Sequence, residues 1–493
     1  MRFSILAHAC MQVEADGKSL VCDPWLTGSA YWGSWWNYPP VSKHIFERLN
    51  PDFIFITHLH WDHFHGPTLR RLGLDRTILI PKAPGTRLRD DLLEMGFKKV
   101  IELPHGTTFK LGNRFQITSY QFGFLPDCLL VIDADGTTLM NANDTKIMGG
   151  PLRKILKNHR EIDFVFRSHS SANSRVCYEI IDRGGLHQDD QSRYSREFAE
   201  FVEATGARYC VPFASNHCFL HPETLRFNSI INFSYSVKKY FDENGIVKPE
   251  CVVMAPGDSW DDLTGFQLGR SDWYTRFDEK VSEYARDNQT SLDAAARKEA
   301  EARLNVELLS SYVANLSAAT PSLIRRVFKD KPITLVCQSG DHTEAFELNL
   351  YSGQVKVVEA VDDARNPIQI ITSSLIIQQC IERRNWESLG ISKRVRYRVA
   401  QRNVKVIRLF QYVYLLYEIG ALPVLKNMNA RFAGVWARRW REILFMLRLG
   451  FDFGLGRGFV YRRYLNVNRF SGPGVQSDEP IRPEMAAGLK SSS

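Results

Sequence analysis

The chain lacks the paired cysteines that a disulfide framework or a zinc ribbon needs. Its nine cysteines are scattered and none stands in a C-x-x-C pair, a usage that suits buried thiols in the reducing cytoplasm. The sequence also lacks any run of eighteen uninterrupted apolar residues, so we expect no membrane-spanning helix. Residues 1–18 hold only a short apolar stretch, which we interpret as a first strand rather than a signal peptide. These absences predict a cytoplasmic protein.

Positive charge is unevenly spread along the chain. The 493 residues carry a formal net charge of +8 and are 44% hydrophobic and 24% charged, a composition typical of globular proteins. Residues 381–470 alone hold nineteen Lys and Arg against five Asp and Glu, so the remainder of the chain is net acidic. Because the chain is too long for one ordinary core, we expect two or three domains, with the basic character confined to the C-terminal part.

Short apolar runs separated by turns organise the first half of the chain. Strand-like runs such as TILIP and CLLVIDA alternate with short helical patterns, which predicts two sheets with helices on their outer faces. Residues 297–316 have the pattern of one helix, and the strand pattern returns after them. We therefore predict an α/β fold in four parts: a sandwich domain at 1–265, a small α/β domain at 266–402, a basic, aromatic helical extension at 403–470 and a disordered tail at 471–493.

The densest chemical signal is the stretch ITHLHWDHFHG at residues 56–66. Side chains at i and i+2 of extended backbone point the same way, so His58 and His60 could share one metal ion, while Asp62 and His63 follow on a turn and could reach a second. Imidazole and carboxylate suit zinc, iron or manganese, and a site without thiolates is more typical of catalysis than of structural zinc. A histidine-rich surface loop is the alternative, which the fixed offsets disfavour.

The pattern THLHWDH resembles the H-x-H-x-D-H motif of the metallo-β-lactamase superfamily. This resemblance implies an αβ/βα sandwich with the metals at one edge. It also implies that Asp23, in VCDPWLTG, braces the metal loop and that Asp144, in NANDTK, bridges two metals. An Asx turn is the alternative for Asp144. Asp62 and Asp144 are then the candidate catalytic groups, which would orient a nucleophile and pass protons.

A longer resemblance links the chain to the catalytic, non-Rieske part of the CMP-N-acetylneuraminate hydroxylase family. It is carried by DPWLTGSAYWGSWWNYPP, THLHWDHFHGPTLRRL, LPDCLLVIDADGTTLMNANDTKI, CVPFASNHCFLHPE and CIERRNWESLGISKRVRYR. A Rieske cluster needs both a C-x-H and a C-x2-H. This sequence has one C-x2-H, from Cys218 to His221, and no C-x-H, so we predict no iron–sulfur cluster.

The superfamily's usual later histidine is missing where this chain reads QFGFLPDC, near Phe124 and Leu125. One metal position is therefore short of a ligand or takes it from elsewhere. His169, at the end of a predicted strand, either supplies that ligand or is a partly buried turn residue.

Four more histidines complete the candidate set. In PFASNHCFLHPE we rank His221 ahead of His217 as the last metal ligand, because His221 aligns better with the hydroxylase family. His8, His65 and His217 are expected to brace the metal ligands or to contact substrate. The predicted metal ligands are His58, His60, Asp62, His63, Asp144, His169 and His221.

These residues predict an enzyme with one or two divalent ions, either zinc, iron or manganese. A metal with an open position lowers the pKa of bound water to about 7, so we favour a metallo-hydrolase acting on a small polar substrate that could contain a sugar or nucleotide. The alternative is an iron-dependent hydroxylase fed by a separate reductase, as the longer resemblance implies. A site that keeps metal for structure alone is a third alternative. The aromatic stretch YWGSWWNYPP either grips a ring substrate or caps the core.

The C-terminal extension at 403–470 predicts a partner surface. The segment RFAGVWARRWREILFMLRLG holds five arginines among Trp, Phe, Leu and Met, which is the composition of a helix lying on an anionic membrane surface. A buried helix in an oligomer contact, with its arginines paired, is the alternative. Nucleic acid is the least favoured partner, because no binding motif accompanies the charge. We therefore expect a cytoplasmic protein that could sit at the inner face of the membrane.

Overall fold

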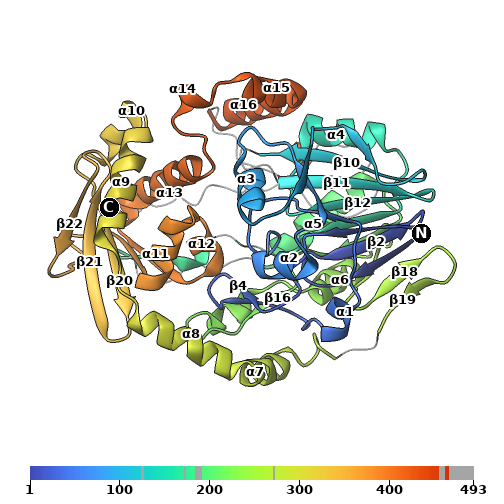
Figure 1. The fold of residues 1–493 in the computed structure, drawn as a ribbon, viewed down its shortest axis with the longest axis horizontal. Coiled ribbons are helices and arrows are strands. Elements are labelled where there is room, and N and C mark those ends of the chain that lie inside the picture. The colour runs from blue at the N-terminus through green and yellow to red at the C-terminus, as the bar shows by residue number, and fades with distance from the viewer. Residues whose placement is uncertain are drawn as a thin grey trace, which may run out of the picture.

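Two β-sheets face each other in one half of the molecule (Figure 1). The computed structural model describes residues 1–123, 127–170, 172, 174–183, 191–269, 272–454 and 461–465. The first sheet has the order β19-β18-β1-β2-β3-β6-β7-β8 and the second the order β17-β15-β13-β12-β11-β10-β9. The first sheet comprises β1 (Arg2–Ile5), β2 (Met11–Ala15), β3 (Lys18–Cys22), β6 (Phe53–Phe55), β7 (Thr77–Pro81), β8 (Lys99–Leu103), β18 (Ser259–Asp261) and β19 (Gly265–Gln267). The second comprises β9 (Thr108–Lys110), β10 (Phe115–Phe122), β11 (Asp127–Ala134), β12 (Thr137–Asn143), β13 (Phe164–Arg167), β15 (Tyr209–Pro212) and β17 (Glu250–Cys251).

Apolar side chains from both sheets fill the space between them. Phe3 and Val13 of the first sheet pack with Leu130, Ile132 and Phe166 of the second in one buried cluster. The inner strands are covered on both faces, which is why TILIP and CLLVIDA appear in the sequence as continuous apolar runs rather than as alternating patterns. The core of this sandwich is therefore encoded locally, strand by strand.

Helices cover the outer face of each sheet. Helices α2 (Gly66–Leu72) and α3 (Arg87–Glu94) bury Leu69 and Leu92 against the first sheet. Helices α4 (Gly149–Asn158), α5 (Gln191–Thr205) and α6 (Ser234–Glu243) cover the second sheet, where Leu152 and Val237 are buried. The predicted αβ/βα sandwich is confirmed. At its edge lie a small sheet of β4 (Ser29–Ala30), β5 (Trp35–Asn37) and β16 (His217–Phe219), and the short helices α1 (Lys43–Glu47), η1 (Arg175–Cys177) and η2 (Leu225–Ile230).

A six-stranded sheet and its helices form a second module beside the sandwich (Figure 1). The sheet has the order β14-β24-β23-β20-β21-β22. Its strands are β14 (Tyr178–Ile180), β20 (Ile333–Ser339), β21 (His342–Asn349), β22 (Gln354–Val358), β23 (Ile368–Ser373) and β24 (Val395–Val399). Its helices are α8 (Gln289–Glu301), α9 (Val306–Ala319), α10 (Ser322–Arg325), η3 (Arg326–Phe328), α11 (Ser374–Glu382), α12 (Ser388–Ser392), η4 (Gln401–Asn403) and α13 (Val404–Glu418). Helix α7 (Phe277–Asp287) leads into the module.

Two boundaries of this module differ from the sequence pattern. Strand β14 comes from the segment predicted to belong to the sandwich, and α13 comes from the predicted helical extension, yet both pack in the buried cluster of the second module. The helix expected at 297–316 is two helices, because Asn305 caps the start of α9 by accepting a hydrogen bond from the Leu308 amide. A side-chain cap of this kind begins a helix rather than continuing one.

The last helices return from the second module to the sandwich (Figure 1). They are α14 (Val424–Asn427), α15 (Ala430–Arg438), α16 (Trp440–Gly454) and α17 (Tyr461–Leu465). Phe445 and Tyr461 join the buried cluster under α4 and α5, and Arg431 bonds the Glu102 carboxylate at the end of β8. Within the described part of the chain, no helix combines the length and the apolar character that crossing a bilayer requires. The tail predicted at 471–493 lies outside the described residues.

The carboxyl group of Glu418, at the end of α13, connects three elements of the second module. It accepts hydrogen bonds from the Trp386 amide, at 2.9 Å and 3.0 Å, and from the Tyr312 hydroxyl, at 2.8 Å. Burial raises the pKa of Glu418 to about 8. The folded protein therefore keeps a proton on this group at neutral pH that the unfolded chain releases.

This shift predicts that the contribution of Glu418 to the free energy of unfolding falls as pH rises from about 5 to about 8, by up to ~1.4 kcal/mol per pH unit. The unfolded chain loses the proton near the ordinary value of 4.5, whereas the folded chain loses it near 8. Urea unfolding of the metal-free protein across this range measures the slope. Relative to wild type, Glu418→Gln should shift this slope in the positive direction, whereas Glu382→Gln, at an exposed site on α11, should leave it unchanged. An unchanged slope in Glu418→Gln would contradict the assignment.

Candidate metal centre

His58 and His60 face each other just beyond the end of β6. Strand β6 runs parallel to β3 and β7, so residues that follow these strands meet at one edge of the sheet. The distance between His58 Nε2 and His60 Nδ1 is 2.8 Å. Burial, with the neighbouring His63 and His60, holds the pKa of His58 well below its usual range. His58 therefore presents the neutral imidazole that a metal ligand must be.

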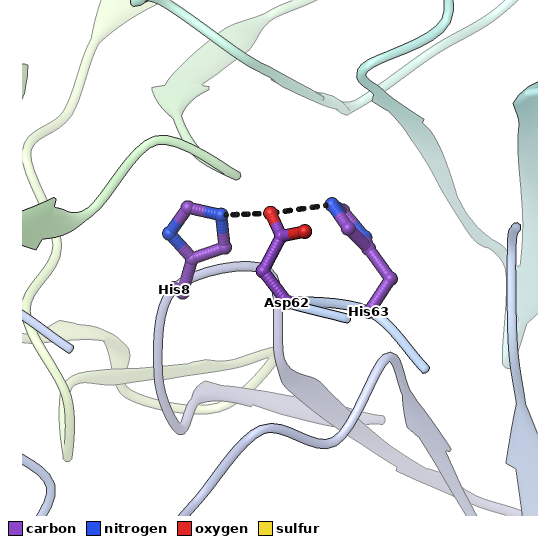
Figure 2. A group of neighbouring side chains, drawn as sticks. All are labelled: His8, Asp62 and His63. Atoms are coloured by element: carbon purple, nitrogen blue, oxygen red, sulfur yellow. Dashed lines mark hydrogen bonds and ion pairs between the residues drawn. The ribbon is translucent and has the colours of Figure 1, made fainter. Parts of the chain in front are cut away.

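Asp62 lies between His8 and His63 (Figure 2). Its Oδ2 atom is 3.0 Å from His8 Nε2 and 3.2 Å from His63 Nε2, and His63 Nε2 is also 3.3 Å from Asp144 Oδ2. Burial opposes ionisation of Asp62, but the charge of His63 and the hydrogen bond and charge of His8 outweigh it and hold the pKa of this carboxyl well below its usual range. The loop thus brings together carboxylates and imidazoles from three separate segments of the chain.

The side chains form two neighbouring groups that could each hold a metal ion. One contains His58, His60 and Asp144, and the other contains His8, Asp62 and His63; within each group the ligand atoms lie within 4.8 Å of one another. The buried His63 Nε2 makes no hydrogen bond within the described residues, although carboxylate oxygens face it. An imidazole nitrogen without a hydrogen bond, surrounded by other imidazoles and carboxylates, is suited to bind zinc, iron or manganese.

Asp23 fixes the metal loop from behind. Its carboxylate accepts hydrogen bonds from the Thr57 amide and hydroxyl, both at 2.8 Å, and from the Asn143 side chain. It also lies 3.0 Å from His63 Nδ1. A carboxylate at Nδ1 fixes the imidazole tautomer and leaves Nε2 to face the metal position. This is the bracing contact that the superfamily resemblance implies for Asp23.

His217 and His221 have different surroundings in the structure. His217 stacks on Trp35 with ring centroids 3.7 Å apart, lies near His8 and lines the same cavity as the metal groups. His221, which the sequence ranks first, lies instead beside Arg394 and Glu223, whose charges influence its pKa, and it belongs to neither metal group of the described residues. Of these two histidines, His217 therefore lines the cavity of the site and His221 does not.

His65 and His169 occupy the two sides of the site. His65 caps helix α2 by accepting a hydrogen bond from the Thr68 amide, and burial lowers its pKa to about 4; its predicted role in bracing the metal ligands or contacting substrate stays a prediction. His169 lines the cavity without joining either group of described ligands; its Nε2 is 3.4 Å from the Ser234 hydroxyl. Burial lowers the pKa of His169 to about 3, which keeps its imidazole neutral.

Asp127 is a site residue that the sequence analysis did not single out. It opens strand β11, immediately after residues 124–126, which lie outside the described residues and include the Phe124 and Leu125 discussed above. Its half-buried carboxyl lines the cavity, and desolvation raises its pKa to about 7 against the opposing charge of His60. The signal in the sequence is a single carboxylate inside the apolar run FGFLPDCLLV, close to where the superfamily's later histidine is missing.

Glu387 is the second missed residue, and it comes from the second module. Its Oε1 atom lies 3.8 Å from His60 Nε2. Burial works against protonation of His60, but the hydrogen bond and charge of Glu387 outweigh burial and raise the pKa of His60 to about 9. Since His60 Nδ1 faces His58, Glu387 reaches the other ring nitrogen. This is the geometry in which an outer carboxylate orients a ligating imidazole.

Contacts from both sides hold the segment that carries Glu387. From helix α3, Arg87 donates to the backbone carbonyls of Arg384, at 3.1 Å, and Glu418, at 2.9 Å. The Arg383 guanidinium lies 5.6 Å from the centre of the Trp61 ring, next to His60 in the chain. The second module is therefore attached directly to the metal loop.

A cavity of about 530 Å³ opens over the metal groups. The sandwich lines it with His60, Asp62, Asp127, Asp144, Lys146, Arg167, His169 and His217, and the second module lines it with Glu387, Tyr397, Arg408, Gln411, Tyr412 and Tyr414. Of the aromatic stretch at 31–40, Trp35 lines this cavity, whereas Tyr31 is buried and donates a hydrogen bond to Asp62. Most of that stretch is therefore packed inside the protein, and substrate contact by Trp35 stays a prediction.

The contact between Glu387 and His60 predicts that Glu387→Gln lowers the affinity of the protein for its metal by roughly 10- to 100-fold. The amide can no longer hold His60 by charge, although its size is unchanged. Competition with a coloured chelator measures the affinity. Glu382→Gln, one helix away and exposed, is the matched control. Equal metal affinities for the two variants would show that Glu387 does not orient His60.

Parts of the chain are similar to known proteins. Residues 2–172 match the family described as the beta-lactamase superfamily domain. A putative Rieske 2Fe-2S iron-sulfur protein of Mycobacterium tuberculosis is 25% identical over 244 residues, 46% of each chain. The cytidine monophosphate-N-acetylneuraminic acid hydroxylase of Mus musculus is 30% identical over 161 residues, 31% of this chain and 28% of the hydroxylase. The matches thus span less than half the length of these relatives.

A solved isothiocyanate hydrolase from Delia radicum gut bacteria is 15% identical, with a TM-score of 0.40, over 53% of this chain and 99% of that chain. The resemblance to the hydroxylase family inferred from the sequence is confirmed over the matched region. The H-x-H-x-D-H loop lies within residues 2–172, the part of the chain that is similar to the beta-lactamase superfamily domain.

Proposed function

We propose that the protein is a metal-dependent hydroxylase of a small polar substrate. The observation that carries this proposal is the pair of neighbouring groups, each of two histidines and one carboxylate, beside a cavity. Sets of two histidines and one carboxylate with open positions are typical of non-haem iron oxygenases. For this reason we favour hydroxylation over hydrolysis, although the sequence alone favours hydrolysis.

The names of the relatives support the same choice. The mycobacterial relative is named a putative Rieske iron-sulfur protein and the mouse relative a hydroxylase. This sequence has one C-x2-H and no C-x-H, so we propose that it binds no Rieske cluster of its own and takes electrons from a separate electron-transfer protein. Each turnover would put one atom of O2 into a substrate C–H bond and release the other as water, consuming two electrons and two protons.

His58, His60 and Asp144 would hold one ion and Asp62, His63 and His8 a second, with Asp127 as a further carboxylate near His60. Iron in these positions would supply the binding and reduction of O2. The identity and number of the ions are part of the proposal.

The chain's own residues would orient the substrate and move protons. Lys146 and Arg408 line the cavity from opposite modules, and their charges favour a substrate with an anionic group. Tyr31 hydrogen-bonds Asp62 and is buried, so it holds that carboxylate in place. The side chains of α13 form one wall of the cavity and would exclude bulk water from the reacting atoms.

Hydrolysis is the second candidate, and the superfamily match favours it. With zinc or manganese, Asp62 or Asp144 would orient a water molecule and take its proton during attack on an ester, amide or lactone. The same cavity and the same ligands would serve both reactions. The two candidates differ in the metal they need and in whether O2 is consumed.

Metal content and oxygen uptake separate the candidates. We expect purified protein to bind iron and to consume O2 only when a reductant is present. His58→Ala and Asp144→Ala should lower metal affinity and uptake by on the order of 100-fold or more. His44→Ala is the control, because His44 is exposed on α1, away from the site. Zinc or manganese with no oxygen uptake, together with hydrolysis of a test ester or lactone, would establish the second candidate instead.

A further inference from the structure

The outward face of α16 is an exposed apolar stripe on an otherwise well-packed helix. The stripe consists of Trp440, Ile443, Leu444, Leu447 and Phe451, whose exposed fractions are 47%, 39%, 55%, 65% and 65%. The spacing of three, four and seven places all five side chains on one side of the helix. Five large apolar side chains gathered on one exposed surface indicate an interaction site.

The opposite face of α16 anchors the helix to the sandwich. Phe445 packs in the buried cluster under α4 and lies against Gly149, where a Cβ atom would come within 2.6 Å of its ring. Glu442 is buried and accepts hydrogen bonds from the Gly123 amide and the Arg439 guanidinium. The stripe is therefore presented by a helix that is fixed in place.

The exposed charges around the stripe are positive. Arg441 and Arg448 are exposed about a quarter turn to one side of it; Arg448 lies 3.9 Å from the Asp452 carboxylate but keeps 55% of its side chain exposed. Lys154 and Lys157 are exposed on α4, which packs against α16. Helices α4 and α15 contain no Asp or Glu, and the two acidic residues of α16, Glu442 and Asp452, are buried. Around the stripe, these three helices thus expose cations without anions.

We propose that α16 docks on an anionic lipid surface, with the stripe in the headgroup–acyl boundary and the flanking cations on the phosphates. An interfacial helix combines an apolar face with basic residues beside it. A contact with a second copy of the chain is disfavoured by charge, because a two-fold interface places each patch against itself and would bring Arg441 and Arg448 toward their own copies. Arg431 and Arg439 are not available for lipid, since Glu102 and Glu442 bind them.

Flotation of the whole protein with lipid vesicles tests this proposal. Wild-type protein should bind vesicles of mixed phosphatidylglycerol and phosphatidylcholine, bind pure phosphatidylcholine at least tenfold more weakly, and detach as salt is raised. Leu444→Ser with Leu447→Ser should weaken binding by on the order of tenfold or more. Arg441→Gln with Arg448→Gln should remove the preference for the anionic lipid.

The matched control is Leu263→Ser with Leu323→Ser, which removes two leucines that are 92% and 74% exposed elsewhere on the molecule and should leave binding unchanged. Circular dichroism verifies that the variants fold. Wild-type protein that ignores anionic vesicles, or leucine variants that bind them as well as wild type does, would overturn the proposal. So would a wild-type dimer in sedimentation velocity that the Leu444 and Leu447 changes convert to monomer without any effect on lipid. No metal or substrate enters these measurements, so their outcome is independent of the reaction catalysed.

Discussion

The buried carboxylate of Asp23 is the contact on which the site depends. It follows β3 and holds the start of the metal loop through Thr57, the imidazole of His63 and the end of β12 through Asn143. One side chain thus ties both sheets of the sandwich to the histidine loop. A buried ion without these partners would be strongly destabilising, so the positions of the loop and of Asp23 determine each other. The apolar core sets the distance between the sheets, and Asp23 sets the orientation of the ligands between them.

The second module is part of the site rather than an attachment to it. Its residue Glu387 reaches His60, its helix α13 forms one wall of the cavity, and Arg87 of the sandwich binds the carbonyls that lead to Glu387. The cavity therefore exists only where the two modules meet, which is a common location for small-molecule sites. In this respect the sandwich supplies the candidate ligands, and the second module supplies the opposite wall of the cavity.

The parts of the site that the sequence predicted are those whose geometry is local. The offsets within H-x-H-x-D-H fix which side chains point together, whereas the position of Asp23 beside them was implied by the superfamily resemblance. The missed contacts join residues far apart in the chain, such as Glu387 with His60, and no periodicity reports such a pairing. Asp127 was missed because it stands inside an apolar run. The order of His217 and His221 could not be read from spacing, because a three-residue strand, β16, turns the first toward the cavity while the second follows it beyond the strand end.

The pairing of strand β14 with a strand far along the chain has a consequence for how the protein folds during synthesis. Strand β14 lies between sandwich strands in the sequence, but it pairs in parallel with β24 of the second module, with Tyr178 opposite Tyr397. During synthesis from the N-terminus, the ribosome must therefore produce more than two hundred further residues before β14 finds its partner. Until then β14 has no partner strand in the nascent chain, and the cavity lacks the wall that Glu387 and α13 form. The cavity is therefore closed only after α13 has been synthesised, and a product terminated before Glu387 would keep the H-x-H-x-D-H loop yet lack the wall that Glu387 and α13 form.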